Sequence, residues 1–99
     1  MESIVKEILA QQEEIKHKLF VDIRLSNGNI LLRSFHIVEM NTAKGIIKGL
    51  TAEEEYAHAR EGRKPQYCIL KVSEIKELNC PELELQYYAG VLAEQKLSA

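Results

Sequence analysis

Several residue types are scarce in this chain of 99 residues. Tryptophan is absent and Phe and Tyr number only two and four, so a core has to be built from Ile, Leu and Val. The two cysteines are too few for a disulfide framework, and we expect reduced, structural thiols. Because no apolar run reaches the length of a membrane span or signal peptide, we expect a cytoplasmic protein without membrane contact.

Positive charge is also lacking, since the formal net charge is −2 at pH 7. This charge supplies no global attraction to nucleic acid or to an anionic membrane, so any such binding needs a local basic patch. The length suits one ordinary globular domain, and we predict a single domain over residues 1–99.

Signatures of catalysis and of metal binding are missing. No histidine or cysteine pair has zinc-finger or zincin spacing, and no glycine lies in a phosphate-binding loop. Three consecutive glutamates at residues 53–55 are typical of a solvated first helical turn. We therefore predict that the protein is not an enzyme, with no catalytic residue, no metal ligand and no cofactor.

The most informative stretch is residues 19–32, where apolar and polar residues alternate up to a turn pair. Leu19, Val21 and Ile23 fall on one face of an extended strand, and Asn27-Gly28 suits the positive φ angles of a tight two-residue turn. The pattern predicts a β-hairpin and hence an antiparallel sheet.

Further strands are predicted after this hairpin. Residues 30–40 are apolar on both faces, which indicates a bulge or strong bend. Residues 46–50 and 66–72 give the third and fourth strands, and a single helical turn at residues 73–78 leads to a short fifth.

Three helices complete the expectation. The first covers residues 3–17 with Ser3 as its cap, and the second begins at the capping box of residues 51–54 and ends at Gly62. A final helix starts at Pro81 and continues weakly to Leu97.

The predicted fold class is α+β. It consists of a bent five-stranded antiparallel small barrel flanked by N- and C-terminal helices, with a helical insertion between strands three and four. Because the short final strand leaves unpaired edge groups and the apolar helices exceed what a small sheet can cover, we also expect a homo-oligomer.

The order of elements resembles that of Sm-like barrels over residues 19–78. Residues 21–28 resemble the first half of the Sm signature, Met40-Asn41 its terminal pair, and residues 69–75 the second signature. In that family the asparagine and the basic residue at these places help to bind a nucleotide, so the resemblance implicates Asn41 and Lys71. Other SH3-like barrels, without any nucleic-acid role, share the same strand, turn and strand.

A cluster of basic residues on the predicted strands is the remaining candidate for a site. If the sheet brings these side chains to one face, an anionic ligand such as RNA or a nucleotide can bind there. The candidate ligand-binding residues are Arg24, Arg33, Asn41, Lys48 and Lys71.

Two functions remain open from the sequence. The first is a non-enzymatic, homo-oligomeric module that binds such an anionic ligand. The alternative is a protein-interaction or inhibitor module that contacts a protein partner through the inserted or the C-terminal helix. Arg60, Arg63 and Lys64 near the end of the inserted helix already complement its negative terminus.

Overall fold

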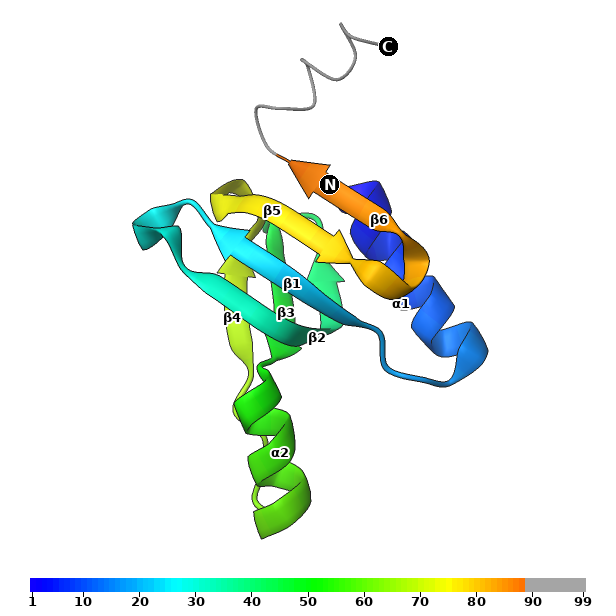
Figure 1. The fold of residues 1–99 in the computed structure, drawn as a ribbon, viewed down its shortest axis with the longest axis vertical. Helices are drawn as coiled ribbons and strands as arrows, with labels where there is room; N and C mark the ends of the chain where they lie inside the picture. Colours follow the sequence, from blue (N-terminus) through cyan, green and yellow to red (C-terminus); the bar gives the residue numbers. More distant parts are fainter. Residues whose placement is uncertain (89–99) are drawn as a thin grey trace, which may run out of the picture.

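Six strands with alternating apolar residues form one strongly twisted antiparallel sheet (Figure 1). The computed structural model describes residues 1–88 of the chain. The order across the sheet is β4-β3-β2-β1-β5-β6, so β4 and β6 form its two edges. The strands are β1 (Phe20–Leu25), β2 (Leu31–Asn41), β3 (Ile46–Leu50), β4 (Cys68–Lys71), β5 (Ile75–Cys80) and β6 (Leu85–Tyr88).

Two α-helices accompany the sheet, as the sequence predicts for residues 3–17 and 51–61. Helix α1 (Glu2–Ile15) buries Val5 and Ile8 in the core, and its N-cap is Met1 rather than Ser3. Helix α2 (Ala52–Glu61) lies between β3 and β4, buries no residue and extends away from the sheet (Figure 1). Three single 3-10 turns are η1 (Asn27–Asn29), η2 (Val72–Glu74) and η3 (Pro81–Leu83).

The hairpin of β1 and β2 is confirmed, but its turn is longer than the predicted two residues. Gly28 has the expected positive φ of 72°, but Asn27 does not have a positive φ, and both residues belong to the 3-10 turn η1. The N–H of Leu25 donates to the carbonyl oxygen of Ile30 at 2.7 Å, and this bond closes the loop of residues 26–29. Ser26 in turn donates its N–H to the carbonyl oxygen of Glu74 at 2.8 Å. This bond joins the turn to η2.

Strand β2 contains the bulges that its two-faced apolar pattern predicts. One extra residue lies between Leu32 and Phe35 opposite β1, and another lies between Ile37 and Glu39 opposite β3. Ser34, in the first bulge, has a positive φ of 53° and donates its N–H to Asp22 Oδ1 at 3.1 Å. Each bulge rotates the strand, so the residues that face the core change along its length.

The predicted five-stranded barrel is wrong, because the sheet has six strands and is open. Within residues 1–88, β4 pairs with β3 alone and β6 with β5 alone, so no hydrogen-bond ladder joins the two edges. Strand β6 pairs with β5 along Cys80↔Leu85 to Glu77↔Tyr88. The sheet is thereby extended beyond β5, the strand that was expected to end it.

The predicted helix from Pro81 to Leu97 is also wrong over its described part. Pro81 starts only the single turn η3, and Glu84 then takes a left-handed conformation with φ 55°. This residue reverses the chain, and Leu85 and Tyr87 pack at the edge of the core. The rest of the predicted helix, residues 89–97, lies outside the described residues.

The core is centred on the inner face of the sheet, and its tightest place is Gly49 on β3. A Cβ atom at Gly49 would collide with the carbonyl oxygen of His36 and lie 2.5 Å from Phe35 Cε1. Phe35 and Ile37 are themselves fully buried. Glycine is therefore required at this position, because the bent β2 and its neighbour β3 approach each other there.

We predict that Gly49→Ala destabilises the protein by about 2 to 3 kcal/mol, because the added methyl group overpacks the core. Gly45→Ala is the control, since Gly45 has a positive φ of 63° but a methyl group there would meet no atom within 4 Å. This control should cost only about 1 kcal/mol for the left-handed backbone. Chemical denaturation measures both values, and an equal loss for both variants would contradict the close approach at Gly49.

Candidate functional site

Three of the five predicted ligand-binding residues lie on one face at the β4 edge of the sheet. The ladder registers place Asn41 on β2, Ile46 on β3 and Lys71 on β4 in one row across the sheet. The next row, Met40, Ile47 and Leu70, points to the opposite face, and the row after it contains Glu39, Lys48 and Ile69. Residues directly opposite on neighbouring antiparallel strands point to the same face, so Asn41, Lys48 and Lys71 share it.

A shallow hollow of about 160 Å³ lies on this face, which we call the edge hollow. The Nζ of Lys48 stands 4.5 Å from the centre of the Tyr67 ring, a cation–π contact at the rim of β4. Neither Lys48 nor Lys71 forms an ion pair with any described residue. Neither ammonium charge is therefore neutralised by a carboxylate within hydrogen-bonding distance, although that of Lys48 already contacts the Tyr67 ring. The lining residues are Glu39, Asn41, Ile46, Lys48 and Ile69.

The side chain of Asn41 has a fixed orientation in the edge hollow. Its Oδ1 accepts a hydrogen bond from the N–H of Lys44 at 3.0 Å, within the turn that joins β2 and β3. This bond occupies the acceptor end of the amide. The Nδ2 group then presents two donors, which suit a negatively charged or carbonyl oxygen.

Arg24 and Arg33 do not join this group. Arg24 pairs with Leu31 at the opposite end of β2, and its Nε lies 3.2 Å from Glu77 Oε2. Arg33 lines a larger hollow of about 420 Å³, where Glu53 faces the same space. That hollow is bounded by Leu31, Leu32, Thr51 and Ala52. Each hollow is lined by one cation and one carboxylate, Arg33 with Glu53 here and Lys48 with Glu39 at the edge hollow. A second cation, Lys71, shares the face of the edge hollow, so that hollow is the better candidate for an anion.

The side chains of two consecutive glutamates, Glu54 and Glu55, make polar contacts between helix α2 and other parts of the chain. Half of the predicted capping box is confirmed at the start of the helix, because Thr51 Oγ1 accepts from the N–H of Glu54 at 3.2 Å. The other half is not formed, since the Glu54 carboxylate has different partners. The carboxylate of Glu54 accepts from the N–H of Gln66 at 3.1 Å and from Arg63 Nη2 at 3.2 Å. These bonds, the one from Gln66 first, lower the pKa of Glu54.

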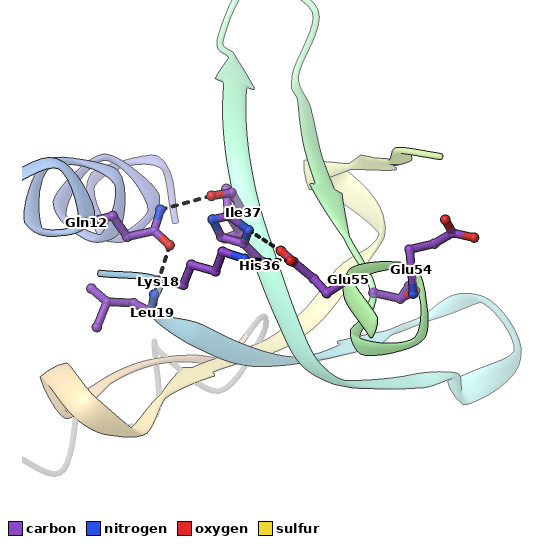
Figure 2. Close-up of polar contacts among 8 residues, drawn as sticks. Gln12, Lys18, Leu19, His36, Ile37, Glu54 and Glu55 are labelled. Atoms are coloured by element: carbon purple, nitrogen blue, oxygen red, sulfur yellow. Dashed lines mark hydrogen bonds and ion pairs between the residues drawn. The ribbon is translucent and has the colours of Figure 1, made fainter. Parts of the chain in front are cut away.

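Glu55 points the other way, toward the sheet (Figure 2). Its Oε1 lies 2.6 Å from His36 Nδ1 on β2, and its Oε2 lies 2.7 Å from Lys18 Nζ. Burial opposes ionisation of this carboxyl, but the hydrogen bonds from Lys18 and His36 outweigh it and lower the pKa of Glu55. The charged carboxylate therefore joins α2 to β2 and to the segment before β1.

Because its pKa is lowered on folding, Glu55 contributes stability that is present above the usual glutamate pKa of about 4.3 and is lost as the pH falls through the folded value. We predict that Glu55→Gln costs about 1 kcal/mol at pH 7. The difference from the wild type should shrink as the pH falls below about 4.3 and vanish once the pH lies below the lowered pKa of folded Glu55.

Denaturation curves at several pH values test this prediction. Glu53→Gln is the matched control, because Glu53 is exposed on the same helix. A loss that is independent of pH for Glu55→Gln would show that the carboxylate contacts do not support α2.

The remaining chemistry of the described chain is limited. Among residues 1–88, no three His, Cys, Asp or Glu side chains gather as metal ligands, and no helix combines the length and apolar character needed to cross a membrane. Cys68 and Cys80 are free thiols, and burial raises the pKa of each. Neither cysteine is predicted to be reactive, because the thiolate is the nucleophilic form.

No protein-family model, no curated protein and no solved structure matches this chain significantly. The case for a function therefore rests on the geometry of the chain itself.

Several residues of the site and its surroundings were not singled out from the sequence. Tyr67 and Ile69 follow the strand alternation, but only the register of β3 and β4 places them beside Lys48. No sequence pattern indicated a role for Gln12. Its Nε2 donates to the carbonyl oxygen of Ile37 and its Oε1 accepts from the N–H of Leu19, each at 3.0 Å (Figure 2). These two bonds join α1 to β2.

Proposed function

We propose that the protein is a non-enzymatic, homo-oligomeric binding module for an anionic ligand, RNA or a nucleotide, at the edge hollow. The observation that carries the proposal is the convergence of Asn41, Lys48 and Lys71 on one face. Arg24 and Arg33 take no part in it. A rigid sheet holds the three side chains, which reduces the entropy lost on binding.

The chemistry of the edge hollow suits both parts of a nucleotide. Lys48 and Lys71 supply positive charge for a phosphate, and the amide N–H groups of Asn41 supply donors. Ile69 and the exposed ring of Tyr67 offer an apolar and aromatic surface against which a base can stack. Glu39, within the same row as Lys48, can accept from an exocyclic amino group.

The resemblance of residues 19–78 to Sm-like barrels supports the same assignment. That family uses an asparagine and a basic residue at the places of Asn41 and Lys71. The long, bulged β2 and the single turn η2 between β4 and β5 fit the order of elements that the resemblance implies.

Two observations support a binding role over an enzymatic one. Within the described part of the chain, no cysteine or serine side chain hydrogen-bonds to a histidine, so no nucleophile is activated by a neighbouring base. His36 contacts Glu55 and lies outside the lining of the edge hollow.

We predict that the double variant Lys48→Ala, Lys71→Ala binds a single-stranded RNA oligonucleotide about tenfold more weakly than the wild type. The slope of log affinity against log salt should fall by roughly 1.4, because each phosphate neutralised on a single strand contributes about 0.7. Fluorescence anisotropy measures both quantities. A parallel titration with a nucleoside monophosphate separates a polymer ligand from a free nucleotide.

The matched control is Arg24→Ala, Arg33→Ala, which removes the same charge from two positions outside the edge hollow. This control should retain most of the affinity and the salt slope. Equal losses in the two double variants would contradict the edge hollow and indicate attraction by net charge alone. No binding of either ligand to the wild type would contradict the proposed function.

One observation favours the second candidate function, a protein-interaction module. Helix α2 buries none of its residues, and Tyr56 on it is 63% exposed beside Arg60, whose guanidinium carbon lies 5.7 Å from the ring centre. An exposed Tyr and Arg on a projecting helix are typical of protein interfaces. Binding of a protein partner that Tyr56→Ala abolishes would favour this function.

A further inference from the structure

The outer side of β4 is an unpaired strand edge. The N–H of Val72 donates to the carbonyl oxygen of Gly45 on the β3 side at 2.9 Å. Hydrogen bonding alternates along an antiparallel strand, so Leu70 and Cys68 also direct their backbone groups toward β3. Ile69 and Lys71 therefore direct their N–H and C=O groups away from the sheet. Among residues 1–88, no other strand accepts or donates along this edge.

The side chains at this edge are exposed and partly apolar. Ile69, in the middle of β4, is 53% exposed, and Tyr67, just before the strand, is 45% exposed. A lysine commonly protects an edge strand from pairing, but Lys71 lies at the end of β4 rather than at its centre. The centre of the edge therefore remains open to a second strand.

We propose that β4 pairs antiparallel with β4 of a second copy of this chain, about a two-fold axis at Ile69. This inference names the interface of the self-association proposed above and rests on it. With the axis at Ile69, the pairing includes every residue from Tyr67 to Lys71. The two sheets then form one continuous sheet across the axis.

The residues that this register brings together are complementary. Ile69 lies opposite Ile69 of the second copy, and Cys68 lies opposite Leu70, so apolar side chains meet on both faces. Lys71 lies opposite Tyr67 of the second copy, where a cation and an aromatic ring attract each other. No like charges are opposed within the paired segment. The same patch serves both copies, as a closed two-fold dimer requires.

The dimer also completes the edge hollow. Ile69 lines this hollow and Lys71 lies two residues further along β4 on the same face, so the two hollows meet across the axis. Tyr67 of the second copy is then added beside Lys71, and four lysines, Lys48 and Lys71 of each copy, lie on one continuous face. This arrangement favours an extended polyanion over a single mononucleotide.

Charge reversal at the axis tests this register. Ile69→Lys and Ile69→Glu each place two like charges opposite each other, so each variant alone should sediment as a monomer at the 11.3 kDa chain mass. An equimolar mixture of the two should regain the dimer, because position 69 then carries opposite charges across the axis. Sedimentation velocity from micromolar to millimolar protein measures the dissociation constants, which should differ by at least about tenfold.

Ile30→Lys is the matched control, because Ile30 is 50% exposed and lies outside β4. This variant should dimerise like the wild type. Ile69→Pro provides a second test and should also be monomeric. The N–H at position 69 points away from β3, so its loss removes a hydrogen bond of the proposed interface and leaves the β3–β4 ladder intact. Denaturation midpoints close to that of the wild type show that each variant is folded.

Each outcome decides between the proposals. A dimer that persists in all Ile69 variants, or a mixture that stays monomeric, overturns the β4 interface and leaves self-association standing. A monomeric wild type overturns self-association as well and leaves the edge free for the strand of another protein. The titrations of the Lys48 and Lys71 variants decide ligand binding independently in every case.

Discussion

The close approach of β3 to the bend of β2 at Gly49 is the constraint on which the rest of the structure depends. No side chain fits between Gly49, Phe35 and the backbone of His36, so the two strands pack tightly at this point. The neighbouring bulge at Val38 rotates the last part of β2. That rotation brings Glu39 and Asn41 to the same face as Lys48, and the edge hollow exists because of it.

The same bend also presents His36 to α2. Adjacent glutamates on one helix then have separate roles. Glu54 accepts from the backbone of Gln66 in the returning chain, whereas Glu55 contacts His36 on the sheet (Figure 2). A helix without a buried residue cannot be positioned by hydrophobic packing. Its orientation therefore depends on charged hydrogen bonds, which are directional but sensitive to pH.

The failures of sequence-based prediction have definite physical causes. The segment after Pro81 contains apolar residues at helical spacing, but Leu85 and Tyr87 also alternate as a strand does. A free edge on β5 and the left-handed turn at Glu84 decide in favour of the strand. Whether the sheet is open or closed likewise depends on which edge strands pair with each other. No local sequence pattern predicts this pairing.

The sequence by itself determined the elements whose signals are local: the helix with its Thr51 N-cap, the positive φ of Gly28 and the bend of β2. It also contained the polar candidates on this face: Asn41 and Lys48 line the edge hollow, and Lys71 lies beside the hollow on the same face. Only the tertiary structure separated them from Arg24 and Arg33 and added Ile69 and Tyr67. The reason is that cross-strand register, which joins residues far apart in the chain, decides which side chains meet.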